Sequence, residues 1–119
     1  MTATPPTETD AVELTLSLLD ALPDDCPPTA LDDALALLSN HRRRRTLMTV
    51  LDHGEPLTLP DVADEVAIDE HDRPLTEISP ETVTNVYISI YHDHLPRLVD
   101  AGLVTYDQER DLVSPAFEL

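Results

Sequence analysis

Lysine is absent from this chain of 119 residues, and glycine, cysteine and aromatic residues are scarce. With two glycines the chain has no glycine-rich loop to cradle a phosphate, and three tyrosines and one phenylalanine make no stacking platform for single-stranded bases. Its one cysteine, Cys26, can form no internal disulfide and lacks the companion ligands of a zinc site. These absences argue against a nucleotide enzyme, a single-strand binder and a disulfide or zinc scaffold.

The sequence also lacks a long apolar run. No stretch approaches the roughly 18 apolar residues that a membrane span needs. The first six residues have neither the positive charge nor the apolar core of a secretion signal. We therefore expect a cytoplasmic protein that does not insert into a membrane.

Acidic residues dominate the charge: 24 aspartates and glutamates stand against seven arginines, which gives a formal net charge of −17. At low ionic strength such an excess of one sign destabilises the compact state by self-repulsion. At about 1 M salt the Debye length falls to about 3 Å, and the repulsion is screened. The composition therefore indicates a halophile that accumulates salt in its cytoplasm. A disordered acidic chain is the alternative, but 41% hydrophobic residues in regular stripes argue against it.

Residues 1–28 are predicted to form an acidic extension, with five prolines, six acids and no base. Its leucines still favour a short amphipathic helix over residues 10–21. Together with the leucines of residues 31–38 they exceed what a small core can cover, so we expect a homodimer formed through the N-terminal helices. The remaining residues, 29–119, form the main domain.

Helical periodicity and capping residues divide the main domain. Start signals precede three of its helices: Asn40 or Ser39, then Thr58, then Ser79 followed by Pro80. We predict helices over 29–38 and 41–53, a third from 58, a loop over 69–78, a helix over 79–101 kinked at Pro96, and a hairpin over 103–106 and 112–114 whose last strand Pro115 restricts to a sheet edge.

Three short helices, a longer final helix and a terminal hairpin resemble the winged helix-turn-helix arrangement. The sequence TLPDVADEVA at 58–67 resembles the second helix of that family, and HLPRLVDAGLV at 94–104 resembles the end of its recognition helix and the start of its first wing strand. The resemblance implies a mostly α fold with a small C-terminal β-hairpin, here with an N-terminal helical extension. More narrowly, the chain is similar to small haloarchaeal winged-helix proteins of unassigned role at residues 38–47, 86–96 and 105–107.

In winged helix-turn-helix proteins the last helix enters the major groove, and the wing touches phosphate or the minor groove. The resemblance implies that the helix at 79–101 and the wing at 103–114 contact duplex DNA. Short polar side chains can read base edges or bond phosphate, and an asparagine can pair with adenine. A merely solvated helix face is the alternative, and this wing is more acidic than a phosphate-touching wing normally is. By position, the exposed face of this helix is expected to carry Glu81, Thr84, Asn85, Ile88, Ser89 and His92. The candidate DNA-binding residues are Thr84, Asn85, Ser89 and His92 on this face and Arg110 in the wing.

Four consecutive arginines, Arg42, Arg43, Arg44 and Arg45, begin the helix at 41–53. Positive charge at a helix N-terminus opposes the helix dipole, so local stability does not explain the run. Helical spacing places Arg42 and Arg45 on the side away from the core, and the other two at its edges. Two accounts stay open. The run binds DNA phosphates, or it pairs with carboxylates inside the protein or across a subunit contact.

No catalytic, metal or cofactor site is predicted. His92 and His94 lie two apart on a helix and point about 200° from each other, so they cannot share one ion, and His94 is expected to pack in the core. The serines lack a base and an orienting partner for nucleophilic catalysis. The sequence therefore predicts a DNA-binding transcriptional regulator rather than an enzyme. The alternative is a protein-interaction or dimerisation module that keeps the winged-helix scaffold without binding DNA.

Overall fold

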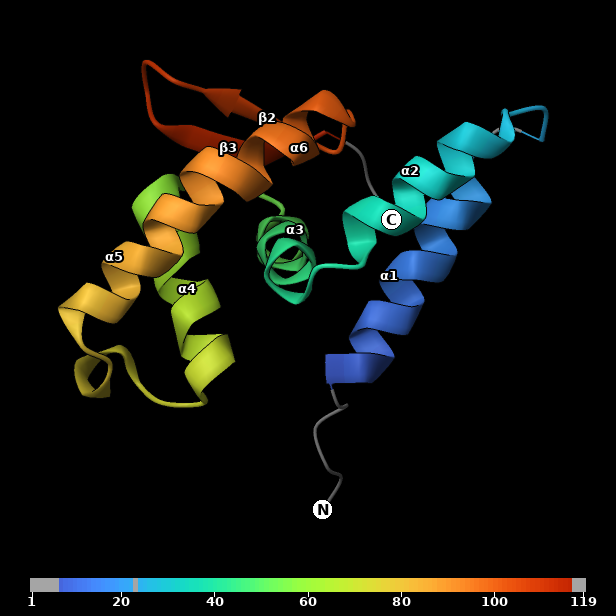
Figure 1. Ribbon diagram of the computed structural model, residues 1–119. Helices are drawn as coiled ribbons and strands as arrows, with labels where there is room; N and C mark the ends of the chain where they lie inside the picture. The colour runs from blue at the N-terminus through green and yellow to red at the C-terminus, as the bar shows by residue number, and fades with distance from the viewer. Residues whose placement is uncertain (1–6, 23, 117–119) are drawn as a thin grey trace.

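The computed structural model of the chain describes residues 7–22 and 24–116, and it is mostly helical with a small antiparallel sheet near the C-terminus. This is the fold class that the sequence predicts. The elements in chain order (Figure 1) are α1 (Thr7–Ala21), α2 (Pro28–Leu38), α3 (His41–His53), β1 (Leu57–Thr58), α4 (Leu59–His71), a 3-10 turn η1 (Leu75–Glu77), α5 (Pro80–Ser89), a π-helical turn η2 (Ile90–His94), α6 (Leu95–Asp100), β2 (Val104–Asp107) and β3 (Leu112–Pro115).

Side-chain caps start three helices where the sequence predicts them. Asn40, Thr58 and Ser79 each accept a hydrogen bond from the backbone N–H three residues further on, at 3.0, 3.2 and 3.2 Å. The prediction of a loop from residue 69 was wrong at its start, because α4 continues to His71. Apolar periodicity ends before that point, but the last turn of α4 is held by the charged contact of Glu70 with α3.

Helix α3 lies in the middle of the molecule, between α2 and α4 (Figure 1). Leu47 and Val50 are fully buried, as the sequence predicts. Thr46 and Thr49 are buried as well, and their hydroxyls donate to the backbone carbonyls four residues earlier, at 2.9 and 2.8 Å. These bonds satisfy the buried hydroxyls within the helix itself. Helix α3 thus buries more than one stripe, because α2, α4 and α6 all pack against it.

Helices α4 and α5 pack against each other and are joined by a connection that contains η1. Helix α4 buries Leu59, Val62 and Val66 completely, and α5 buries Val86. The side of α5 opposite Val86 is left to solvent. Helix α5 is the first part of the helix at 79–101, to which the winged helix-turn-helix resemblance assigns the contact with DNA.

The sheet has three strands in the order β1-β3-β2, with β1 and β2 both antiparallel to β3. Strand β3 is therefore central, and the prediction that Pro115 restricts it to a sheet edge was wrong. Strand β1 was not predicted, and its two residues pair with Leu112 and Val113. Pro115 is tolerated because it lies at the end of β3 beyond the reach of β1, where it pairs only with Val104 of β2.

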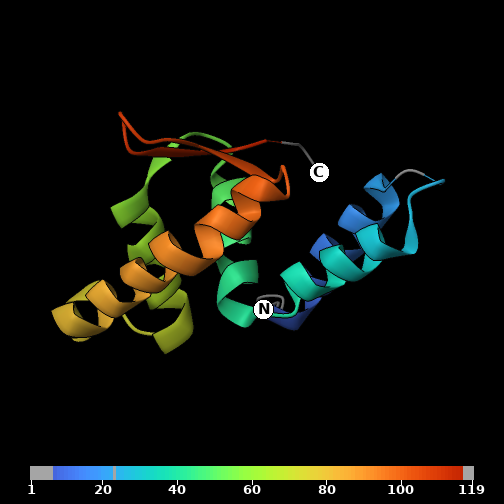
Figure 2. The ribbon, with the colours of Figure 1, turned by 45° about the horizontal axis from the view of Figure 1, so that its top comes forward.

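The N-terminal helices α1 and α2 form a hairpin that lies beside α3, on the side away from α5 (Figures 1 and 2). Leu14 and Leu18 of α1 are buried and belong to the same core cluster as α3 and α4. Part of the leucine excess is therefore covered within one chain. Four large apolar side chains of the hairpin stay exposed, namely Val12, Leu16, Leu31 and Leu35.

Candidate nucleic-acid interface

The exposed face of α5 and η2 has an unusual composition for this chain. Thr84, Asn85, Ile88, Tyr91 and His92 are all exposed there, and none of them is acidic. Over the whole chain, by contrast, 24 of the 119 residues are acids. The one acid on this side of the helix is Glu81, in the first turn, where a carboxylate is favoured by the helix dipole. We call Thr84, Asn85, Ile88, Tyr91 and His92 the reading face.

The reading face is fixed by the opposite side of the same helix. Val86 and Ile90 are almost completely buried, and Val83 and Tyr87 pack partly against the core. The Tyr87 and Tyr91 rings stack with centroids 6.3 Å apart and planes 8° apart. The helix therefore presents the reading face in one orientation.

A π-helical turn replaces the simple kink that Pro96 leads one to expect. The Leu95 N–H donates to the carbonyl of Ile90, five residues earlier, and Pro96 follows at the start of α6. A π turn often accommodates a local disruption inside a longer helix, frequently at a functional position. Helical structure continues from Pro80 to Asp100. The predicted extent of the last helix is thus confirmed, with a widened turn next to His92.

Ser89 does not belong to the reading face. Its side chain is half-buried, and its hydroxyl donates to the carbonyl of Val86 and accepts from Arg42 Nη1, both at 2.9 Å. The expectation that Ser89 is exposed was wrong, because a guanidinium from α3 reaches it across the helix packing. Thr84, Asn85 and His92 are exposed, as predicted.

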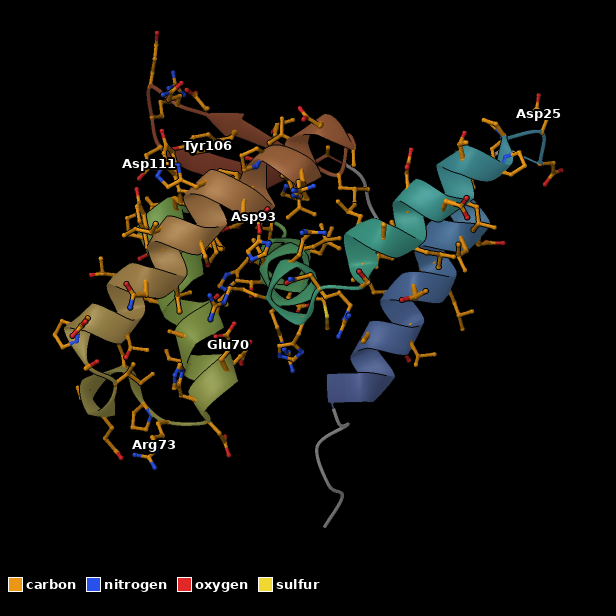
Figure 3. All side chains as sticks on the ribbon, in the orientation of Figure 1. Asp25, Glu70, Arg73, Asp93, Tyr106 and Asp111 are labelled. Carbon is orange, nitrogen blue, oxygen red and sulfur yellow. The ribbon has the colours of Figure 1, made fainter. Side chains whose placement is uncertain are left out.

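Arg42 is held by a carboxylate fork. Its Nε and Nη2 atoms donate to the two oxygens of Glu70, at 2.6 and 2.7 Å. The side chains of Arg42 and Glu70 are 32% and 13% exposed. The pKa of Arg42 is raised by the hydrogen bond to Glu70, against the opposing effect of burial. Figure 3 labels Glu70, which α4 directs toward α3. The Arg42–Glu70 pair links α3 to α4. A third donor of Arg42, Nη1, links both helices to α5 through Ser89.

The next two arginines cap the helix that precedes them. Arg43 Nη1 donates to the carbonyl of Leu37 at 3.1 Å, and Arg44 Nη1 donates to the carbonyl of Leu38 at 2.5 Å. These carbonyls belong to the last turn of α2, where a helix leaves its C=O groups without partners. Positive charge is favourable at that end of a helix dipole. The charge that opposes the dipole of α3 therefore stabilises the C-terminus of α2.

Arg45 faces Asp69 of α4, with Nη1 3.8 Å from the carboxylate, and its side chain is only 13% exposed. Helical spacing alone placed Arg42 and Arg45 on an uncovered side of α3. That expectation was wrong, because α4 covers this side and supplies both acids. The four arginines are thus directed toward carboxylates and carbonyls of the same chain, which is one of the two accounts that the sequence left open.

The remaining arginines are exposed. Arg110 in the wing has a side chain 78% exposed, with Nε 3.8 Å from Asp107, while Asp107 Oδ1 also accepts from two backbone N–H groups of the turn. Arg97 of α6 donates to Asp93 at 2.7 Å, and this hydrogen bond lowers the pKa of Asp93. Arg73, labelled in Figure 3, lies in the turn after α4 and makes no ion pair within the described part of the chain.

The sequence analysis did not single out Arg73 and Arg97, which the structure places on the surface, Arg97 in a hydrogen bond with Asp93. Their position in the sequence could have indicated that they are exposed, because they are two of only three arginines outside the run. An arginine that stands alone in the sequence can remain on the surface. Four consecutive arginines at the start of a central helix point in several directions, so some of them must contact neighbouring helices.

His94 is buried, as predicted, and its Nδ1 atom lies 3.7 Å from the carboxylate of Asp93. Burial lowers the pKa of His94, while Asp93 acts in the opposite direction. His92 points to solvent instead, so the two rings do not converge. Within residues 7–22 and 24–116 no group of three or more histidine, cysteine, aspartate or glutamate side chains is close enough to hold a metal ion.

Residues 35–114 match the family described as Domain of unknown function (DUF7344). The match covers 80 of the 119 residues, and the chain belongs to this family. The matched segment runs from the end of α2 through β3, so it contains the arginine run, the reading face and the wing. No curated protein and no solved structure matches the chain significantly. Among the described helices, none is long and apolar enough to cross a membrane.

Proposed function

We propose that this protein is a DNA-binding transcriptional regulator that acts at high salt in the cytoplasm of a halophile. It contacts duplex DNA through the reading face on α5 and η2 and through the wing. The observation that carries the proposal is that Glu81, in the first turn, is the one acid among the described residues on the side of α5 that bears the reading face. Carboxylates directed at a phosphate backbone would be repelled, and acids make up 24 of the 119 residues of this chain.

The net charge of −17 does not oppose this function at high salt. At about 1 M salt the long-range repulsion is screened, and most of the gain from counterion release is also lost. Short-range hydrogen bonds and shape then decide the affinity. Few cations are needed, and Arg73, Arg97 and Arg110 are those available on the surface.

Binding as a homodimer belongs to the same proposal. The exposed apolar side chains of the α1–α2 hairpin give a second copy a surface to cover, and a dimer presents two reading faces to two half-sites. Leu16→Ser combined with Leu35→Ser should yield monomers by light scattering at high salt, because both positions are exposed and contribute little to the core. A mass that stays dimeric would place the interface elsewhere, and a monomeric wild type would refute the dimer.

The test of DNA binding is selection of duplexes from a random library in about 2 M KCl, followed by Asn85→Ala on the selected site. Loss of a bidentate contact should cost about 1–3 kcal/mol and relax discrimination at one base pair, with non-specific binding nearly unchanged. The matched control is Asp25→Ala, at the far tip of the α1–α2 hairpin (Figure 3). If no duplex is enriched at any salt, or if Asn85→Ala binds as the wild type does, direct readout by α5 is refuted.

One observation favours a second function, that of a protein-interaction module on the winged-helix scaffold. The arginine run, which is the largest basic feature of the chain, is directed inward to Glu70, Asp69 and the end of α2 rather than to an external anion. The reading face would then be a contact for another protein. In that case the library selection fails, while substitution of Ile88 or Tyr91 disrupts a protein complex.

A further inference from the structure

Arginine and lysine are absent from residues 80–94, which include the whole reading face. Arginine or lysine donating to the O6 and N7 atoms of guanine is the commonest specific contact in the major groove. The reading face therefore lacks the usual means of recognising a G·C pair. It carries instead an amide, a threonine, a histidine, a tyrosine and a large exposed apolar side chain.

Ile88 occupies the centre of this face. It lies four residues after Thr84 and three after Asn85, so all three side chains project from adjacent turns of α5. The Ile88 side chain is 47% exposed although the helix has a complete buried side of its own. Nothing in the packing of α5 requires an isoleucine there. The neighbouring Tyr91, which is also exposed, extends the apolar part of the face along the same side.

We infer that the reading face recognises A·T base pairs in the major groove, with Asn85 contacting adenine and Ile88 contacting the C5-methyl group of a thymine. This inference rests on the proposed function, namely that α5 enters the major groove. The thymine methyl is the one apolar group that the base edges present in that groove, and the bidentate partner of adenine is an asparagine or glutamine. Asn85 and Ile88 supply both chemistries one helical turn apart.

High salt makes the apolar contact more important for this protein. Charged contacts to phosphate weaken as salt rises, whereas burial of apolar surface does not weaken in the same way. A methyl group that is removed from water against Ile88 should contribute about four-fold in affinity, equivalent to about 0.8 kcal/mol for one buried carbon.

The experiment has two stages in about 2 M KCl. Duplexes are first selected from a random library with the full chain. The enriched site is then synthesised with deoxyuridine in place of each thymidine in turn, which removes the C5-methyl group and keeps every hydrogen-bonding group of the base. Wild-type protein should lose about four-fold in affinity at one or two positions. Ile88→Ala should bind the thymidine and deoxyuridine duplexes equally, and Asn85→Ala should keep the methyl effect while losing discrimination for adenine.

Each outcome decides a different claim. An enriched site whose centre is G·C overturns A·T recognition and leaves DNA binding standing. A wild-type affinity that deoxyuridine leaves unchanged at every position overturns the contact between Ile88 and a thymine methyl group. A methyl effect that survives in Ile88→Ala overturns the assignment to Ile88. A library with no enriched duplex overturns the proposed function, and A·T recognition with it. Because Ile88 and Asn85 are both exposed, circular dichroism should show both variants folded as the wild type is.

Discussion

Replacing Glu70 with glutamine should destabilise the protein by about 1–2 kcal/mol. Glu70 accepts two hydrogen bonds from Arg42, and its side chain is 13% exposed. Breaking a buried ion pair costs about 3–5 kcal/mol, and an exposed pair contributes about 0.2–1 kcal/mol. The Arg42–Glu70 pair lies between these limits because the arginine is one-third exposed, and glutamine retains one acceptor oxygen.

The matched control is Asp69→Asn, on the same helix and beside the same arginine run. Both variants remove one negative charge, so both relieve the general acidic repulsion equally. Asp69 is 45% exposed and 3.8 Å from Arg45, a contact that should contribute less than about 1 kcal/mol. The difference between the two variants therefore isolates the fork.

Thermal unfolding followed by circular dichroism measures that difference. For a chain of this size about 1 kcal/mol corresponds to roughly 4 °C in Tm. The deficit of Glu70→Gln should persist at about 3 M KCl, because hydrogen-bonded and partly buried charges are screened little, whereas any deficit of Asp69→Asn should fade. If Glu70→Gln melts at or above the temperature of Asp69→Asn at every salt concentration, the fork does not stabilise the fold.

Three further outcomes can be measured on the same protein. The Tm should climb as KCl is raised from about 0.1 M to about 3 M, since screening weakens the repulsion among 24 acids, and a flat or falling series would remove the halophile argument. Burial and the hydrogen bond to Asp111 raise the pKa of Tyr106 to about 12, so Asp111→Asn should bring one phenol into titration at lower pH, and an unchanged ultraviolet titration would contradict the contact. Burial lowers the pKa of His94 in the folded state, so the unfolded chain binds more protons and the free energy of unfolding should fall as pH drops below about 6.5. His94→Gln should remove that part of the pH dependence, and an equal slope in both proteins would show that other groups cause it.

The sequence predicted those features of the fold that local chemistry controls. Thr58 and Ser79 cap their helices through atoms only three residues away, so their roles are visible in a short segment. Strand β1 could not be predicted in this way, because its two residues are a strand only by pairing with β3, more than 50 residues further along the chain. The central position of β3 follows from the same pairing. For that reason Pro115 was predicted to lie in an edge strand, although β3 is the central strand.

The same distinction between local and long-range contacts separates the correct from the wrong predictions in the candidate site. Exposure of Thr84, Asn85 and His92 follows from the helical period, and the structure confirms it. Ser89 lies at a position that the period marks as exposed, but Arg42 reaches it from α3. Helical spacing describes one helix, and it contains no information on which neighbouring helix covers a given side. The same limitation applies to Arg45, which α4 covers.

The distribution of cations bears on both the stability of this chain and its proposed function. The four arginines of the run, directed inward, give α3 its contacts with Glu70, Asp69 and the carbonyl end of α2, and these contacts operate whether or not DNA is bound. At most three arginines are left for phosphate, so the salt dependence of DNA binding should be shallow, with a logarithmic slope no steeper than about −3. A protein that works at high salt gains little from a steeper slope, because the counterions that DNA would release already face a concentrated salt solution. Under the proposed function, affinity comes from contacts that salt does not weaken, and the reading face, with an amide and an exposed isoleucine one turn apart, supplies contacts of that kind.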